Sequence, residues 1–371
     1  MAANLAASVR VLVVNAGSTS LKLGVVDTAD GTATPLAGGD VAAAARSAGS
    51  LDAVGHRVVH GGTRFLGPAV IDDAVRAGIA GLAPLAPLHQ PPALAGIDAA
   101  RAALPGLAHV ASFDTAFHRT LPAGARLYAL PAEWCERLGI RRYGFHGLSV
   151  AHAAPRAAEM LACDPAETRV VVCHLGGGAS VTAVDRGRSV ETTMGFSPLE
   201  GLVMATRSGS VDPGAILALL RAGLDPDALE RMLDRESGLL GLTGTGDMRE
   251  VLARAAAGDG VAEDALALYA HRVRAAIAAS AAAMGGLDVL AFTGGVGERA
   301  PEVRRRAVEG LGFLGLGLDE AANAAAVDGA DAPIADGPVP IVVVAAREDL
   351  VIAREAASLT TPAARGRPGP P

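Results

Sequence analysis

The chain has 371 residues, a formal net charge of −7 at pH 7 and a hydrophobic fraction of 50%, yet only 3% of its residues are aromatic. This length suffices for two domains, whose cores must be built mainly from Ala, Val and Leu. The negative charge argues against nonspecific binding to nucleic acid or to anionic membranes, since both require a positive surface. Three cysteines without metal-ligand spacing, no long apolar segment and a poor match to a signal peptide predict a soluble cytoplasmic protein without disulfides.

The elements expected from apolar patterning begin with a strand at 11–14, a small-residue turn at 16–20 and a second strand at 21–26. Asp212 before Pro213 is a typical helix N-cap, and the segment 247–249 is expected to lead into a helix. Strands often followed by helices favour an α/β fold. The remaining expected elements are strands at 109–112, 288–293 and 339–346, a glycine turn at 294–297, helices at 263–284, from Pro301 and at 349–358, a loop at 329–338 and a disordered tail at 362–371.

The strand–turn–strand pattern of the N-terminal segment returns at 169–184, again around a glycine-rich turn. In this comparison Ser20 overlays Ser180 and Leu21 overlays Val181. The recurrence predicts an internal duplication, with two related domains that each present a glycine-rich hairpin at one cleft. Two unrelated hairpins remain the alternative, because glycine turns are common.

A single lysine, Lys22, occurs among the 32 Lys and Arg residues, and it lies beside the first glycine turn. Lysine offers a compact, flexible point charge that suits a phosphate group, whereas arginine is a wide planar fork. Glycine turns expose backbone N–H groups to anionic oxygens. Together they favour a nucleotide phosphate site, although no P-loop motif is present and the lysine could be a compositional accident.

A competing motif, G-x-G-x-x-A, begins at Gly295 and ends at Ala300, with acidic Asp319 about twenty residues later. Alone it would predict a dinucleotide-binding Rossmann fold and an NAD-dependent enzyme. Its late position in the chain and the unexplained hairpin at 15–22 argue against this interpretation.

Several charged residues have neighbours that suit ligand binding. Arg57 and Arg207 each stand among small residues, as a guanidinium facing a cavity would, although most arginines are simply solvated. Asp114 follows a strand and could hold Mg²⁺, act as a base or cap a turn. Glu348 precedes the last helix and could be only a favourable charge at its N-terminus. His146 lies in a turn, where a lone histidine is usually structural.

Taken together, the segments of this chain resemble those of the acetate kinase family. The similar segments run in order from about residue 11 to 355 and are highly specific as a set. They are 15–22, 55–62, 113–118, 142–147, 174–176, 206–209, 212–213, 292–298 and 348–353.

The resemblance implies two duplicated RNase H-like domains of the actin and Hsp70 superfamily, with ATP bound in the cleft between them. It implies domains at 1–118 plus 352–371 and at 119–351, with the second forming a homodimer. It also implies reversible phosphorylation of acetate by ATP, giving acetyl phosphate and ADP. Propionate or butyrate as the substrate, or a noncatalytic nucleotide-binding protein, are the alternatives.

The resemblance further implies a role for individual residues. Asn15 and Glu348 would support Mg²⁺, or Mn²⁺, and Lys22 would lie near the phosphates. Arg57 would hold the substrate carboxylate, and Asp114 would be the catalytic carboxylate that organises it or the metal. His146 and Arg207 would stabilise the transferring phosphoryl group. The implied acyl-substrate residues are Val59, Leu88, His89, Phe145 and Pro198. The implied nucleotide residues are His174, Leu175, Gly176, Gly177, Gly178, Asp247, Met248, Arg249, Gly295, Val296, Gly297, Glu298 and Arg299.

Four positions depart from the family pattern. Gly177, Arg299 and Gln90 stand where asparagine is usual, and Ser210 stands where aspartate is expected. Because Gly177 and Arg299 fall in the implied nucleotide site, they leave the preferred phosphoryl donor open. The implied catalytic residues are all present, so we expect an active kinase.

Overall fold

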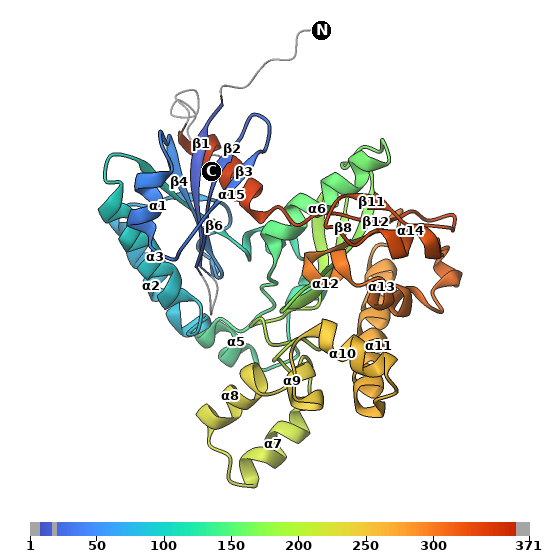
Figure 1. Ribbon diagram of the computed structural model, residues 1–371. Helices are drawn as coiled ribbons and strands as arrows, with labels where there is room; N and C mark the ends of the chain where they lie inside the picture. The colour runs from blue at the N-terminus through green and yellow to red at the C-terminus, as the bar shows by residue number, and fades with distance from the viewer. Residues whose placement is uncertain (1–7, 17–20, 361–371) are drawn as a thin grey trace. The chain divides into compact units, whose positions relative to one another are not determined.

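The computed structural model describes residues 8–16 and 21–360 (Figure 1). Their contacts divide the chain into two compact units. The first unit comprises Met1–Arg119, Gly147–His152 and Arg347–Pro371, and the second comprises Thr120–His146 and Ala153–Ala346. These limits differ from the expected domain boundaries mainly at 147–152, which lie with the first unit because Gly147 N donates to Asp114 O (3.0 Å) and Leu148 joins the first core.

The first unit is built on a six-stranded mixed sheet with the order β3-β2-β1-β4-β6-β5. Strands β1, β2 and β3 are antiparallel, β1, β4 and β6 run parallel, and β5 is antiparallel to β6. The strands are β1 (Arg10–Ala16), β2 (Leu21–Asp27), β3 (Ala33–Leu36), β4 (Ala53–Val58), β5 (Ala69–Val70) and β6 (Ala108–Phe113). The first two confirm the strands expected around Lys22.

Both faces of this sheet are covered, which explains the nearly continuous apolar run of β1. Val11 and Val13 pack against α15, while Leu12 and Val14 pack on the other face against α1 and α3. Helix α15 lies so close to β4 that a side chain at Gly55 would collide with Ile352. The helices of this unit are α1 (Val41–Ser47), α2 (Asp73–Gly81), α3 (Gln90–Ala103) and α15 (Glu348–Thr360), with 3-10 turns at Ala83–Leu85 and Ala116–Thr120.

The second unit repeats this architecture. Its sheet has the order β11-β12-β10-β7-β8-β9, again with an antiparallel trio joined to parallel strands and a final antiparallel strand. Read in the opposite direction, the order matches the first sheet strand for strand, which confirms the expected duplication. The strands are β7 (Arg169–Leu175), β8 (Ala179–Asp185), β9 (Arg188–Thr192), β10 (Val289–Thr293), β11 (Ala332–Pro333) and β12 (Ile341–Val343).

The strand registers correct the expected overlay of the two hairpins. Lys22 pairs with Asn15 one residue before the turn, and Ser180 pairs with His174 at the equivalent place. Lys22, rather than Ser20, therefore corresponds to Ser180. The first turn is one residue longer than the second, so alignment through the glycines misplaced the second strand by two residues. Residues 17–20 of the expected turn and 361–371 of the expected tail lie outside the described residues.

Helices surround the second sheet, and several begin where the sequence predicts. Asp212 caps α7 by accepting from Gly214 N, and Asp247 caps α10 by accepting from Arg249 N. The long helix α11 begins three residues before its expected start because Asp259 caps it. The helices are α4 (Ala123–Arg126), α5 (Ala132–Leu138), α6 (Gly147–Met160), α7 (Pro213–Arg221), α8 (Pro226–Arg235), α9 (Gly238–Thr243), α10 (Met248–Ala256), α11 (Gly260–Ala283), α12 (Gly294–Arg299), α13 (Pro301–Val308) and α14 (Glu320–Ala325), with a 3-10 turn at Gly312–Leu314.

Two expected elements are wrong in detail. The glycine turn at 294–297 is the first part of helix α12, and the helix beginning at Pro301 is separate. Strand β12 is shorter than the expected 339–346, because Ala345 N and Ala346 N donate to the side chains of Asp331 and Glu298 instead of to the sheet. None of the helices in the described ranges combines the length and apolar character needed to cross a bilayer.

A buried histidine pair joins two parallel strands of the first unit. His56 Nε2 lies 3.0 Å from His109 Nδ1, and His109 Nε2 lies 3.1 Å from Leu104 O. Burial and the charge of His109 lower the pKa of His56 to about 3, and burial also lowers the pKa of His109. Both rings are therefore neutral in the folded protein at neutral pH.

This pair predicts a loss of stability in mild acid. Between about pH 6.5, the ordinary histidine pKa, and pH 3, the unfolded chain binds more protons than the folded one, so the free energy of unfolding falls as the pH falls. Urea unfolding from pH 7.5 to 4.5 measures the slope. The His56→Leu variant should show a shallower slope, whereas an unchanged slope would contradict a role for His56.

Candidate functional site

The first unit gathers polar side chains at one edge and one face of its sheet. Asn15 and Arg57 are each the penultimate residue of a strand, and Asp114 follows the end of β6. Because β1, β4 and β6 are parallel neighbours, their carboxyl ends meet at the same edge. Alternation along each strand places all three residues on the face that α15 covers. Helix α15 begins with Glu348, which completes the cluster.

Hydrogen bonds join these four residues. Arg57 holds Asp114 with two bonds, from Nε to Oδ1 at 3.1 Å and from Nη2 to Oδ2 at 2.6 Å. Its Nη1 donates to Asn15 Oδ1 at 3.3 Å, and Asn15 Nδ2 lies 3.5 Å from Glu348 Oε2. These bonds use three of the five N–H groups of the guanidinium, and among the described residues the other two have no acceptor and could bind another anion.

The cluster carries one positive and two negative charges. Asp114 is 1% exposed and Arg57 16% exposed. Burial raises the pKa of Asp114, Arg57 opposes this rise, and Glu348 adds to it. For Arg57, burial alone would lower the pKa, but Asp114 and Glu348 raise it, so the guanidinium stays charged.

These oxygens fit Mg²⁺ in the manner of a kinase site. The described residues contain no cluster of three or more His, Cys, Asp or Glu side chains that would form a closed metal cage. Mg²⁺ is commonly bound by one or two carboxylates together with substrate phosphates and water, and not by an all-protein cage. Asp114 and Glu348 offer such a partial set, together with the amide of Asn15, which bonds to both Arg57 and Glu348.

Lys22 lies on the same sheet face as this cluster. It pairs with Asn15 across β1 and β2, and its side chain is exposed. The lone lysine therefore extends from the edge at which Asn15, Arg57 and Asp114 gather.

In the second unit, two expected site residues, His146 and Arg207, converge on Gly178. A Cβ built at Gly178 would lie 3.1 Å from His146 Nε2 and 3.5 Å from Arg207 Nη1. Glycine is thus what lets the imidazole and the guanidinium approach the turn after β7. Arg207 is held in place because its Nε donates to Asp234 Oδ1 at 3.0 Å.

His146 is fixed from two sides. Its Nδ1 lies 3.0 Å from Ser180 Oγ, and its ring centroid is 4.2 Å from that of His174. Its backbone adopts a left-handed conformation, with φ 58°, which is uncommon for a residue other than glycine. Such strain persists only where the surroundings enforce it, and it is frequent at functional sites.

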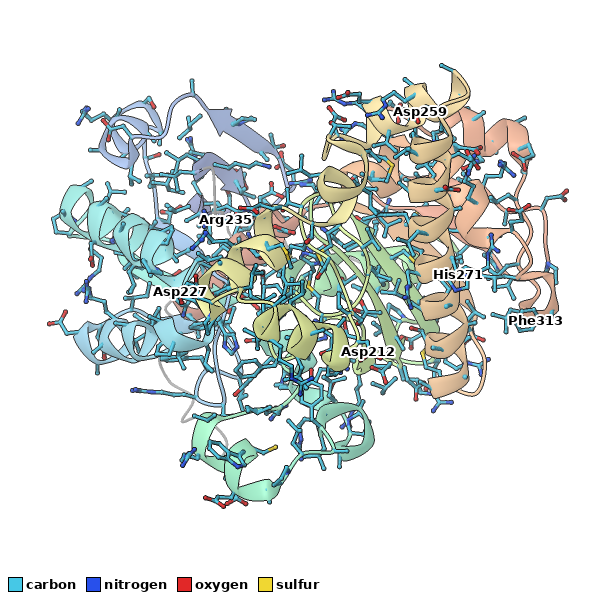
Figure 2. The ribbon with its side chains drawn as sticks, turned by 90° about the horizontal axis from the view of Figure 1, so that it is seen from below. Asp212, Asp227, Arg235, Asp259, His271 and Phe313 are labelled. Carbon is cyan, nitrogen blue, oxygen red and sulfur yellow. The ribbon has the colours of Figure 1, made fainter. Side chains whose placement is uncertain are left out.

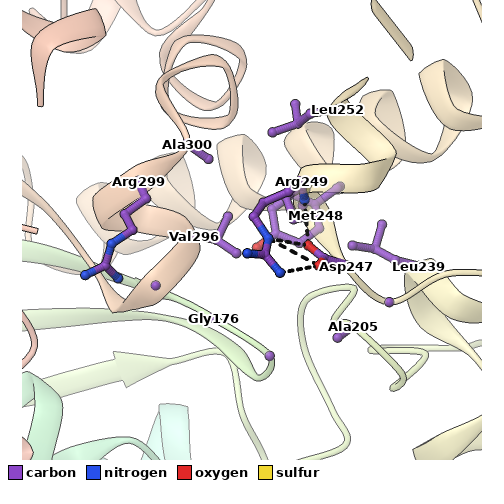
Figure 3. Close-up of a pocket in the computed structure, with 14 residues that line it drawn as sticks. Gly176, Ala205, Leu239, Asp247, Met248, Arg249, Leu252, Val296, Arg299 and Ala300 are labelled. Atoms are coloured by element: carbon purple, nitrogen blue, oxygen red, sulfur yellow. Dashed lines mark hydrogen bonds and ion pairs between the residues drawn. The ribbon is translucent and has the colours of Figure 1, made fainter. Parts of the chain in front are cut away.

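A cavity of about 620 Å³ opens beside the same glycine turn (Figure 3). Gly176 and Gly177 line one part of it, and α9, α10, α11 and α12 provide the rest. Gly294, at the start of α12, has φ 78°, and a Cβ there would collide with Leu175 O, so this helix can begin so close to β7 only with glycine. The lining residues are Gly176, Gly177, Ala205, Leu239, Gly246, Asp247, Met248, Arg249, Leu252, Tyr269, Gly295, Val296, Arg299 and Ala300.

Most of the expected nucleotide residues of this unit line the cavity. Those that do not are Leu175, His174, Gly178, Gly297 and Glu298. Leu175 is buried in the sheet, and Glu298 Oε1 accepts from Ala346 N at 3.0 Å. The sequence interpretation missed Ala205, Leu239, Gly246, Leu252, Tyr269 and Ala300. For Tyr269 a signal existed, since it is one of three tyrosines and stands in an alanine-rich helix.

The expected acyl-substrate residues divide between the two units. Val59, Leu88 and His89 belong to the first unit, where Val59 is buried and His89 precedes α3. Phe145 and Pro198 belong to the second, and Pro198 O lies 3.4 Å from Arg207 Nη1.

The four residues that depart from the family pattern lie in different surroundings. A side chain at Gly177 would enter open space, so glycine is not required there by packing. Arg299 is 58% exposed at the cavity. Gln90 is buried and its Nε2 donates to His60 O at 3.0 Å, while Ser210 Oγ accepts from Gly201 N at 3.1 Å.

A buried arginine anchors the helix that carries the cavity wall. Arg304 is fully buried, and all five of its N–H groups donate to neutral oxygens. Nη1 reaches Gly297 O and Glu298 O, and the other donors reach Asn323 and Ala326 O. Burial lowers the pKa of Arg304 to about 10, so it remains charged at neutral pH. It thereby ties α12 to α14.

Two units with one shared strand order, one with a carboxylate–arginine cluster and one with a glycine-lined cavity, define a duplicated RNase H-like protein of the phosphotransferase type. Comparison with known proteins makes this more specific. The sequence profile of the Acetokinase family matches residues 40–354. The chain belongs to the acetate kinase family.

Individual relatives agree with this assignment. Acetate kinase of Leifsonia xyli subsp. xyli is 54% identical over 308 residues, which are 82% of this chain and 78% of the relative. The crystal structure of Porphyromonas gingivalis acetate kinase superposes with a TM-score of 0.87 at 34% identity, covering 95% of this chain and 100% of that one. A propionate kinase from Francisella tularensis subsp. tularensis gives the same TM-score and identity, covering 94% and 99%.

Removal of the Arg304 side chain should loosen the cavity wall that α12 forms. The Arg304→Met variant leaves several buried carbonyl oxygens without donors, so we expect a loss of about 3 kcal/mol or more in the free energy of unfolding, together with weaker nucleotide binding. Urea unfolding and nucleotide titration measure the two effects. Arg274→Met is the control, because the half-exposed Arg274 also donates to a backbone carbonyl, that of Arg306. Equal effects of the two substitutions would contradict the anchoring role.

Proposed function

We propose that this chain is a kinase that transfers the γ-phosphoryl group of ATP to acetate, reversibly, giving acetyl phosphate and ADP. The observation that carries the proposal is the buried Arg57–Asp114 ion pair with two guanidinium N–H groups left over, in a member of the acetate kinase family. A fixed arginine fork is well suited to bind a small carboxylate.

The nucleotide is assigned to the cavity of the second unit. Its glycine turn offers backbone N–H groups without side chains, which suits phosphates, and its apolar walls suit a base. Asp247, exposed at the cavity rim, would accept hydrogen bonds from ribose hydroxyl groups. Lys22 would attract the phosphates by its charge.

The reaction needs positioning and charge neutralisation more than proton transfer. A carboxylate oxygen of acetate attacks the γ-phosphorus, and the bond to the bridging oxygen breaks as ADP leaves. Because acetate is already ionised, Asp114 need not act as a base and instead orients Arg57. His146 and Arg207, which meet at Gly178, would neutralise charge on the transferring group.

Mg²⁺, or Mn²⁺ in its place, would be held by Asn15, Asp114 and Glu348 together with the nucleotide. The metal would supply charge neutralisation at the phosphate oxygens. The raised pKa of Asp114 supports this role, since an added cation would favour its ionised form.

Propionate remains an alternative substrate. The propionate kinase from Francisella tularensis subsp. tularensis is as similar in fold as the Porphyromonas gingivalis acetate kinase. Four of the five implied acyl-substrate residues are apolar, which suits a short alkyl chain.

A homodimer formed through helix α7 is part of the proposal. This helix is rich in leucine yet buries none of its residues within the unit, and Val211 and Leu217 are 41% and 49% exposed. Figure 2 labels Asp212 at its start. An apolar helix left uncovered is typical of an interface.

We further propose a cytoplasmic location. The three cysteines are free thiols, and burial raises the pKa of Cys173, which keeps that thiol protonated. Free thiols and an ATP-dependent reaction both suit a reducing compartment.

The Arg57 substitution tests the proposed chemistry. Arg57→Ala should lower kcat/KM for acetate by about a hundred- to a thousandfold in a hydroxylamine-trap assay with ATP and Mg²⁺, because one fixed charge is lost. Arg57→Lys, which keeps the charge beside Asp114 but not the fork, should recover part of the activity. Arg76→Ala breaks an exposed ion pair in the same unit and should have little effect. Wild-type activity in Arg57→Ala would refute the carboxylate clamp, and assays with propionate and butyrate rank the substrates.

The α7 interface predicts a monomeric variant. Leu217→Arg should shift the sedimentation coefficient from that of a dimer to that of a monomer, because it buries a charge in an apolar contact. Phe313→Arg is the control, since Phe313 is 77% exposed but lies on another part of the same unit (Figure 2). A dimer that survives Leu217→Arg and dissociates with Phe313→Arg would show that the interface includes Phe313 and not α7.

A further inference from the structure

Asp234 is a largely buried carboxylate of the second unit that the proposed mechanism does not use. It is the penultimate residue of α8, and its Oδ1 accepts a hydrogen bond from Arg207 Nε at 3.0 Å. Both side chains are 16% exposed, so the ion pair is largely shielded from water. A charge-assisted bond of this kind fixes the orientation of the planar guanidinium. Asp234 thereby limits where the other nitrogen atoms of Arg207 can lie.

The far end of the Arg207 guanidinium lies at the glycine turn after β7. Its Nη1 is 3.4 Å from Pro198 O and would be 3.5 Å from a Cβ built at Gly178, which His146 Nε2 also approaches. One end of the guanidinium is thus tied to α8, and the other is at the place where the proposed mechanism needs positive charge. Arginine has several rotatable bonds, so without an anchor its guanidinium would occupy several positions.

The backbone around Arg207 is held independently of the Asp234 carboxylate. Ser208 N donates to Leu233 O at 2.9 Å. Thr206 Oγ1 donates to Asp234 O at 2.9 Å, and any residue at position 234 would keep this bond because the acceptor belongs to the main chain. Removal of the carboxylate should therefore release the guanidinium without releasing the segment that carries it.

We propose that Asp234 is a positioning residue of the phosphoryl transfer, which holds the Arg207 guanidinium in the orientation that neutralises charge on the transferring group. The inference rests on the proposed function and adds to it a residue that acts through Arg207. A preoriented charge contributes most when charge develops in the transition state, so its displacement should lower kcat more than it raises KM.

The test is the Asp234→Ala variant in the hydroxylamine-trap assay. Its kcat should fall by about 10- to 100-fold, the scale of loss when a catalytic group is displaced by about 1 Å. KM for acetate, and the affinity for ADP measured by calorimetric titration, should stay the same. Asp234→Asn keeps a side-chain oxygen that can accept from Arg207 Nε and should recover most of the lost kcat.

A double-mutant cycle shows whether Asp234 acts through Arg207. In the Arg207→Ala background, Asp234→Ala should lower kcat no further, because the group that Asp234 orients is absent. A role confined to the stability of α8 would instead lower the melting temperature in both backgrounds and leave the kcat of the folded protein unchanged.

Asp227→Ala and Arg235→Ala are controls on the same helix (Figure 2). Asp227 is exposed, and Arg235 is 57% exposed with its Nε 3.9 Å from Asp234 Oδ2. Both substitutions should leave kcat unchanged, since an exposed ion pair contributes little.

A wild-type kcat in Asp234→Ala would overturn the inference, as would an equal fall of kcat in the presence and absence of the Arg207 side chain. An equal loss of kcat and of ADP affinity would also contradict it. If the wild-type protein forms acetyl phosphate in these cases, the proposed function stands although the inference fails. If the wild-type protein forms no acyl phosphate, the proposed function fails, and the inference fails with it because no phosphoryl group is transferred.

Discussion

The buried ion pair between Arg57 and Asp114 is the interaction on which the site of the first unit depends. It exists because three parallel neighbours, β1, β4 and β6, end at one edge and place alternate residues under α15. Arg57 compensates the burial of Asp114, and Asp114 fixes the orientation of the guanidinium. Neither residue would be tolerated there alone, since an unpaired buried charge is strongly destabilising.

The second unit has the same strand order but different polar residues at its hairpin. Where the first hairpin has Asn15 opposite Lys22, the second has His174 opposite Ser180, and both of these contact His146. Gly178 then permits His146 and Arg207 to approach the turn. The same strand order therefore occurs twice, with different residues at the matched positions of the two hairpins.

Patterns of neighbouring residues were sufficient to predict some features of the structure and not others. Residues close together in the chain were enough to predict strands β1 and β2, the cap Asp212, the helix after Asp247 and the repeat itself. The overlay of the hairpins was two residues off because the turns differ in length. Nothing near Arg304 distinguishes it from the other arginines, since its acceptors come from Asn323 and Ala326 on another helix.

What the sequence determined by itself was the alternation of apolar residues, the glycine positions and the ordered motifs, because these act through neighbouring residues along the backbone. They defined an α/β protein with a repeated unit and indicated the acetate kinase family. Only the tertiary structure decided which N–H groups of Arg57 are engaged, that Glu298 bonds the backbone of Ala346, and that Arg304 and Tyr269 support the cavity. Hydrogen-bond partners and burial depend on segments far apart in the chain, and their meeting is fixed by packing.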